Sequence, residues 1–309
     1  MSIVVNTNVA SMNAQRSLMS SGRELQNAME RLSTGKKINS ASDDAAGFAI
    51  AESMTAQVRG LSMAAKNAND ALGLLKVVEN ATNDVTDMLQ RIRELAVQAQ
   101  SGTNSAGDIA NLQQEANALI DEIGRVSTDT KYNGKARIGG DAATLSIQVG
   151  YNDGDVIQIT TYDIKAENLG KKINNAATAS PTDDKVLYAL KDATLHSATG
   201  GYLNIAQTAT AESGTTNRVP GALEVITGAI EQVAMYKAEW GAGQNRLQYT
   251  VSNLMNVVEF TTAAKSRIQD ADFAVEAAKL AKAQVLQQTG TAMLAQANAA
   301  PQLALQLLK

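Results

Sequence analysis

Both ends of the chain carry a thin apolar stripe with the period of an α-helix. Leucine recurs every seven residues near the N-terminus, whereas alanine dominates the apolar side near the C-terminus. Each alanine removes little area from water, and weakly apolar helices are marginal in isolation. The pattern predicts that the terminal helices pack on each other and on other copies of the chain. The positions assigned to this packing are Leu18, Leu25, Met29, Leu32, Phe273 and Leu280.

Two longer stretches between the ends also have helical periodicity. The first runs from about residue 42 to residue 100, and at 1.5 Å per residue it predicts a rod of roughly 85–90 Å. The second, 221–268, keeps one apolar seam over about six heptads and matches the first in length. The two stretches predict an antiparallel pair of rods, which brings the terminal helices, 3–32 and 270–309, side by side.

Polar residues and glycines mark the expected helix ends. Gly35 suits the position after a helix C-terminus, where a left-handed backbone conformation is common. Ser42 or Asp43 is predicted to cap the long helix that follows. Asp108 is predicted to cap a shorter helix that continues through Ile123.

The hydrophobic period changes to two in the middle of the chain. Alternating apolar residues on both sides of Asn152-Asp153-Gly154 predict a β-hairpin over 145–159. Residues 163–175 are expected to form a short helix. The segment 176–219 is rich in Ala, Thr, Ser, Gly and Asn and is predicted to be a small irregular surface insert. The fold class is thus mainly α, with long antiparallel helical rods, paired terminal helices, a hairpin and this insert.

Composition narrows the function further. The 309 residues carry a formal charge of −4 and a pI near 5.2, which argues against non-specific nucleic-acid binding. There is no cysteine, so disulfides, thiolate catalysis and thiolate metal ligands are excluded. No signal peptide for the general export pathway is evident, and no apolar run reaches the roughly 18 residues of a membrane helix.

Candidate chemical sites are weak. His196 is the single histidine, so zinc motifs with two histidines are excluded, and we expect it to be a solvated loop residue. Asp43 with Asp44 resembles a metal pair but fits a helix start better. The acidic turn 152–155 lacks the length and closing glutamate of an EF-hand. No cofactor and no catalytic residue is predicted, and the chain is not expected to be an enzyme.

Long segments at both ends resemble those of a known family. LSTGKKINSASDDAAGFAIAESM (32–54), LQRIRELAVQA (89–99) and LSIQVGYNDGDVIQI (145–159) are similar to the N-terminal part of bacterial flagellin. SRIQDADFAVEAAKLAKAQVLQQTGTAMLAQANAAPQLALQLL (266–308) resembles its C-terminal part. The resemblance covers roughly 1–165 and 221–309, and its motifs are long, ordered and collinear.

The resemblance implies a filament subunit with a defined domain plan. Residues 1–40 and 270–309 would form the inner filament core, and 41–175 with 220–269 a rod-shaped bundle that bears the hairpin. Residues 176–219 would be a short variable insert. In the family the termini fold on assembly, and the subunit is exported by the flagellar type III apparatus to an extracellular filament.

The resemblance also implies partners and contact residues. The partners are other copies of the chain, an export chaperone at the C-terminus, and the filament cap and hook-junction proteins. Membranes and nucleic acids are not among them. The tail Leu303, Leu305 and Leu308 would serve the chaperone first and core packing later. A surface for a neighbouring subunit or a host immune receptor maps to Arg91, Leu95 and Glu115. Candidate O-glycosylation sites are Thr208, Thr210, Ser213, Thr215 and Thr216.

Three other functions stay open from sequence alone. A hook–filament junction protein shares the terminal organisation, although the fit of 266–308 favours flagellin. A secreted monomeric ligand of a host receptor would need stable terminal cores, which the alanine-rich stripes do not provide. An enzyme displayed on a filament would need a catalytic insert, and 176–219 is short and poor in catalytic residues.

Overall fold

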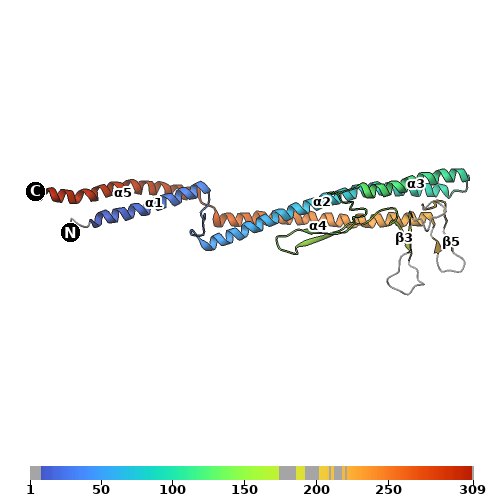
Figure 1. The fold of residues 1–309 in the computed structure, drawn as a ribbon, viewed down its shortest axis with the longest axis horizontal. Helices are drawn as coiled ribbons and strands as arrows, with labels where there is room; N and C mark the ends of the chain where they lie inside the picture. Colours follow the sequence, from blue (N-terminus) through green and yellow to red (C-terminus); the bar gives the residue numbers. More distant parts are fainter. Residues whose placement is uncertain are drawn as a thin grey trace, which may run out of the picture. The chain divides into compact units, whose positions relative to one another are not determined.

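The computed structural model describes residues 8–173, 186–191, 202–208, 210–211, 218–219 and 221–307, and it is mainly helical (Figure 1). Its contacts divide the chain into two compact units. The terminal unit comprises residues up to Gly60 and from Asn256, and the central unit is Leu61–Met255. The helices are α1 (Val9–Thr34), α2 (Ala45–Ala99), α3 (Ala106–Asp129), α4 (Ala222–Gln269) and α5 (Phe273–Leu307). The strands are β1 (Thr144–Gln148), β2 (Val156–Thr160), β3 (Gly170–Ile173), β4 (Val186–Ala189), β5 (Thr210–Ala211) and β6 (Arg218–Val219).

The terminal unit pairs the two ends of the chain. α1 and α5 lie side by side along their length (Figure 1). Asn8 Nδ2 donates to the carbonyl of Ala297 at 2.7 Å, and Arg31 forms an ion pair with Glu276 at the other end, so the helices are antiparallel. This confirms the predicted pairing of the terminal helices.

The structure corrects two predicted helix caps. Gly35 has φ of 70° and its N–H donates to the carbonyl of Arg31, as predicted for the end of α1. The cap of α2 is Asp44, whose Oδ1 accepts from the N–H of Ala46 and of Gly47. Asp43 instead accepts from backbone groups before the helix, so Ser42 and Asp43 were the wrong choice.

The start of α3 differs in a similar way. Ser105 is the N-cap, and its hydroxyl accepts from the N–H of Asp108 at 3.2 Å. Asp108, the predicted cap, returns a hydrogen bond to the N–H of Ser105 at 3.0 Å. The two residues form a reciprocal capping box, in which either partner could be taken for the cap from sequence alone.

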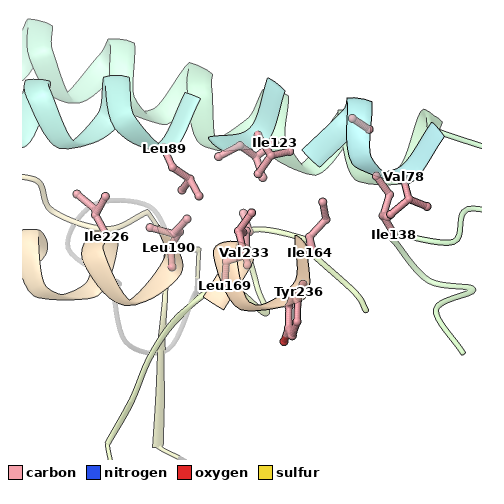
Figure 2. Close-up of a cluster of buried hydrophobic side chains, with 14 of the residues drawn as sticks. Val78, Leu89, Ile123, Ile138, Ile164, Leu169, Leu190, Ile226, Val233 and Tyr236 are labelled. Atoms are coloured by element: carbon pink, nitrogen blue, oxygen red, sulfur yellow. The ribbon is translucent and has the colours of Figure 1, made fainter. Parts of the chain in front are cut away.

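The central unit is built on an antiparallel pair of helices, as predicted. Gln244 of α4 donates to Glu79 of α2 at 2.9 Å, and Lys237 donates to Asn83 at 2.6 Å, so one sequence number rises as the other falls. The buried cluster collects side chains from α2, α3, α4 and the strands between them (Figure 2). Its largest fully buried members are Trp240, Leu75, Leu89, Ile92, Leu95, Ile120, Ile123, Ile138, Ile164, Leu169, Leu190 and Leu203.

The predicted hairpin is confirmed. β1 pairs antiparallel with β2, and Leu145 faces Ile159 while Ile147 faces Ile157. Ile157 and Ile159 are buried, as the period of two requires for one packed face. Gly154, at φ of 89°, supplies the left-handed backbone of the connecting turn.

Three aromatic rings fix the exit of the hairpin on α4. The Trp240 indole N–H donates to the carbonyl of Thr160 at 2.8 Å. Tyr162 stacks on Tyr236 with ring centroids 4.0 Å apart, and its hydroxyl donates to Glu239 at 2.7 Å. The hydrogen bond to Glu239, aided by burial, raises the pKa of Tyr162 to about 12. These three rings are among the few aromatic side chains of the protein, and they form one cluster, the aromatic joint, where the segment after β2 contacts α4.

The middle of the chain differs most from prediction. The described part of the predicted helix 163–175 is not helical, and its residues 170–173 form β3, which pairs with β4. Within the predicted surface insert, Leu190, Leu203 and Ile205 are buried in the core of the central unit. Leu190 ends a short apolar run, 186–190, and Leu203 and Ile205 lie on either side of Asn204. These signals are too short to distinguish a buried segment from an irregular insert.

Polar contacts hold this segment on α3. Asp121 accepts from Lys191 Nζ at 2.6 Å and from the Tyr202 hydroxyl at 2.7 Å. Lys191 also lies 4.7 Å above the centroid of the Tyr202 ring. About two turns earlier on α3, Gln113 accepts from the N–H of Ile205 and donates to the carbonyl of Leu203, both at 2.9 Å. The described parts of 190–208 are therefore a packed element of the central unit.

Candidate assembly surface

The terminal unit exposes many large apolar side chains. They are distributed over α1, α5 and the adjoining ends of α2 and α4, where a single soluble chain would place polar residues. The exposed large apolar residues of this unit are Val9, Met12, Met19, Met29, Ile50, Val257, Phe260, Phe273, Val275, Val285, Leu286 and Met293. A surface of this kind marks a protein–protein contact.

The seam between α1 and α5 is made largely of small residues. Ser11, Ser21 and Ala28 are its buried positions on α1, and Ala283 is buried on α5. Gly290 lies so close to Leu18 that an added Cβ would be 3.1 Å from the leucine Cδ1. These side chains allow the helices to approach closely but bury little apolar area, so the pair gains little from the hydrophobic effect.

A groove of about 590 Å³ follows this seam. Its walls are small side chains of α1, including Ala10 and Ala14, and larger side chains of α5, including Leu286 and Met293. Gly290 also lines this groove. The groove offers an apolar recess next to protruding apolar side chains, which is the form of a surface that can receive a copy of itself.

The predicted packing residues are divided between the seam and the outer surface. Leu18, Leu25, Leu32 and Leu280 are half-buried in the single chain. Met29 is 52% exposed and Phe273 is 71% exposed, so neither side chain is buried within one subunit. Their role in contacts between copies stays a prediction. Leu303 and Leu305 lie on α5, and Leu308 lies outside the described residues.

The second predicted contact surface lies on α2 and α3. Arg91 Nε and Nη2 contact Glu115 Oε1 at 2.9 and 2.8 Å, and Nη1 contacts Glu94 at 3.1 Å. The hydrogen bonds to Glu115 and then to Glu94 raise the pKa of the Arg91 guanidinium. The structure therefore brings Arg91 and Glu115 together on an exposed face.

Leu95 does not belong to that face. It is 1% exposed and lies in the core with Leu89 and Ile92, so its predicted place on the contact surface was wrong. Both α3 and α4 pack against this part of α2. With two neighbouring helices, more positions of α2 are buried than a single heptad stripe predicts. The outward apolar residue that the sequence analysis missed is Val97, which is 56% exposed. Val97 lines a groove with Gln90, Arg93, Glu94, Gln98 and Ile230.

This arrangement predicts opposite outcomes for two neighbouring substitutions. Leu95→Ala should lower the free energy of unfolding by about 2–5 kcal/mol, because it leaves a cavity in a packed core. Arg91→Ala should change it little, because exposed ion pairs contribute little. Denaturant unfolding of both full-length variants checks the prediction. Equal losses would show that Leu95 is not a core residue.

The candidate O-glycosylation sites are only partly described. Thr208 is exposed, and Thr210 lies in β5. Ser213, Thr215 and Thr216 lie outside the described residues, as does His196. Modification of these residues stays a prediction.

The described residues contain no group of three His, Cys, Asp or Glu side chains placed to hold a metal ion. Among the same residues, no helix combines the length and apolar character needed to cross a bilayer.

The fold and the exposed apolar surface of the terminal unit define a class: helical subunits that associate with copies of themselves. The family model for the bacterial flagellin N-terminal helical region matches residues 5–142, and the model for the bacterial flagellin C-terminal helical region matches residues 223–308. The chain belongs to the bacterial flagellin family. It is a structural subunit of the flagellar filament and polymerises with itself, as the sequence resemblance predicted, and the hook–filament junction and receptor-ligand alternatives are not favoured.

Two relatives that align over the full chain agree with this assignment. A flagellin of Xenorhabdus nematophila is 41% identical over 313 residues, and the alignment covers 100% of both chains. Flagellin C of Vibrio cholerae is 35% identical over 378 residues, again with 100% of both chains covered. Among solved structures, Bacillus cereus flagellin is 22% identical with a TM-score of 0.40, covering 61% of this chain and 88% of that one.

Proposed function

We propose that the terminal unit is the part of the subunit that joins copies of the chain into the filament. The observation that carries this proposal is the exposed apolar surface of α1 and α5, together with the groove that contains Gly290. Burial of that surface against neighbouring copies would supply the apolar contact that the alanine- and serine-rich seam lacks within one chain. The central unit, with its own packed core, would act as a preformed body that the terminal helices attach to the filament.

The terminal helices would become fully ordered on assembly. A seam of Ser11, Ser21, Ala28 and Ala283 provides little stabilisation against the loss of chain entropy in two helices. Contacts with neighbouring copies would supply the remainder, so that ordering and binding occur together. Such coupling would restrict growth to filament ends, where a full set of neighbours is available.

The remaining roles follow from membership of the family. We propose export through the flagellar type III apparatus, an extracellular location, an export chaperone on the C-terminal tail, and contacts with cap and hook-junction proteins. The subunit would be non-enzymatic and need no cofactor. A host immune receptor is a weaker candidate partner, because the burial of Leu95 leaves Arg91 and Glu115 as the exposed members of that predicted surface.

Seeded growth with a matched pair of substitutions tests the proposed assembly surface. Leu286→Asp places a carboxylate in the groove of the terminal unit, and Gln288→Asp places the same charge on an already polar exposed position of α5. Purified chains would be added to short filament fragments and the filament length measured by electron microscopy. We expect Leu286→Asp to reduce growth at least tenfold and Gln288→Asp to reduce it far less, because burying a charge without a partner is costly. Normal growth of Leu286→Asp would contradict the proposed surface.

A further inference from the structure

One carboxylate is buried in the seam between α1 and α5. The Glu276 side chain keeps only 6% of its exposure, and its Oε1 lies 3.5 Å from Arg31 Nη1 and 2.7 Å from Lys279 Nζ. Lys279 is on the same helix, so Arg31 is the cation that the opposite helix supplies. A buried carboxylate loses its hydration and requires partners of this kind.

Arg31 also contacts a third segment of the chain. Its Nη2 lies 3.9 Å from Oδ1 of Asp43, in the connection between α1 and α2. The other oxygen of Asp43 accepts from the backbone N–H of Ser40 at 3.0 Å and of Asn39 at 3.1 Å. These hydrogen bonds lower the pKa of Asp43, so the carboxyl stays ionised beside Arg31. Arg31, Asp43 and Glu276 together form what we term the polar lock.

The rest of the seam specifies the register of the two helices only weakly. Its fully buried members are serine and alanine, so sliding α1 by one turn would again place small side chains against small side chains at those positions, while half-buried Leu18 would leave its contact with Gly290. At the serine and alanine positions the buried apolar area would change little, and with it their hydrophobic contribution to stability. A buried charged group is different, because it is stable only where its partner lies opposite.

Other registers leave Glu276 without a cation from α1. A slip of one turn along α1 would place Asn27 opposite Glu276, and a slip of two turns would place Glu24 there; both residues line the hollow beside it. In the other direction α1 ends at Thr34. The alternatives therefore pair a buried carboxylate with a neutral amide, with a second carboxylate, or with the end of the helix.

We propose that Arg31, through Glu276 and Asp43, selects a single register of α1 on α5 and joins that helix pair to the segment 35–44. Arg31 acts as a positioning residue within one chain. The consequence for polymerisation rests on the function proposed above: a subunit with slipped terminal helices would present its apolar side chains out of step with its neighbours.

Disulfide formation can report the register, because the chain has no cysteine of its own. Ser11→Cys with Asn298→Cys reports the native register, since Ser11 Oγ and Asn298 Oδ1 are 2.7 Å apart. Ser11→Cys with Leu294→Cys reports a slip of one turn. Both pairs would be introduced into the full chain and oxidised, in the free chain and in filaments grown from fragments.

Each cysteine pair would be combined with substitutions inside and outside the lock. Arg31→Met and Glu276→Gln remove lock charges, whereas Arg16→Met and Glu30→Gln make the same chemical changes at exposed positions of α1. We expect each lock substitution to lower the ratio of native to slipped disulfide at least tenfold and each control to leave it within about twofold. A ratio for Arg31→Met equal to that for Arg16→Met in both samples would overturn the proposal.

Exchanging the charges provides a second test. Arg31→Glu combined with Glu276→Arg restores an ion pair between the helices but places a carboxylate next to Asp43. The exchanged chain should recover the disulfide ratio relative to either single change, which measures the coupling of the two positions. It should still need a higher concentration than the unaltered chain to extend filament fragments. Failure of the unaltered chain to grow would count against the proposed function alone, because the free-chain ratio tests the register independently.

Discussion

A chain that lacks residues 1–33 and 270–309 is expected to add no length to filament fragments, even at concentrations at which the full chain grows readily. The deletion removes nearly all of α1 and the whole of α5, and with them the groove and most of the exposed apolar side chains of the terminal unit. Without that area, a subunit has no apolar contact to offset the cost of immobilising it in a filament. Electron microscopy of parallel samples checks the result.

The control for this experiment is the fold of the central unit. Its buried cluster extends from Ala68 to Leu247 and draws on none of the deleted residues. The truncated chain should therefore keep a cooperative unfolding transition in circular dichroism. Filament growth by a folded truncated chain would show that assembly does not depend on the terminal unit.

Trp240→Ala is expected to give the largest loss of stability among single substitutions in the central unit. The indole is 1% exposed, contacts Tyr162 and Tyr236, and donates to the carbonyl of Thr160. Replacing a buried tryptophan by alanine costs about 3–5 kcal/mol through the cavity it leaves, and here it also leaves a carbonyl without its donor. Denaturant unfolding followed by circular dichroism measures the loss.

Tyr249→Ala is the matched control for that substitution. Tyr249 lies on the same helix and is 79% exposed, so its removal should alter the unfolding midpoint only slightly. Trp240→Phe should fall between the two, because it keeps most of the buried ring but loses the N–H donor. Equal midpoints for Trp240→Ala and Tyr249→Ala would mean that the aromatic joint contributes nothing to the stability of the central unit.

The long helices and the hairpin could be predicted because their signals are local and repeated. Heptads over 221–268 and alternation around Asn152-Asp153-Gly154 each report the structure of the residues that carry them. The position of Gly35 after the end of α1 could also be predicted, because the left-handed conformation common after a helix favours glycine. The pairing of the termini could be predicted because the apolar face of each terminal helix is too small to stabilise that helix by itself.

The errors share a different cause, which is that burial depends on distant neighbours. Leu95 is buried because both α3 and α4 cover α2 at that point, and a heptad pattern cannot count covering elements. Leu190 and Leu203 carry only short local signals, and their burial goes with contacts to Leu169 and to Gln113 of α3, which are distant in sequence. At Asp43 and Asp44 the ambiguity is local: both carboxylates can accept backbone hydrogen bonds, and only the path of the chain decides which of them caps the helix.

The pairing of α1 with α5 joins positions that are almost a whole chain apart: 289 residues separate Asn8 from its acceptor at Ala297. Closing so large a loop costs entropy, and no local contact can begin the process early. During synthesis, α1 therefore cannot form its native pair until α5 has been made. A product of interrupted translation would lack the partner for α1 and could not complete the terminal unit, so the pairing itself acts as a check that only finished chains pass.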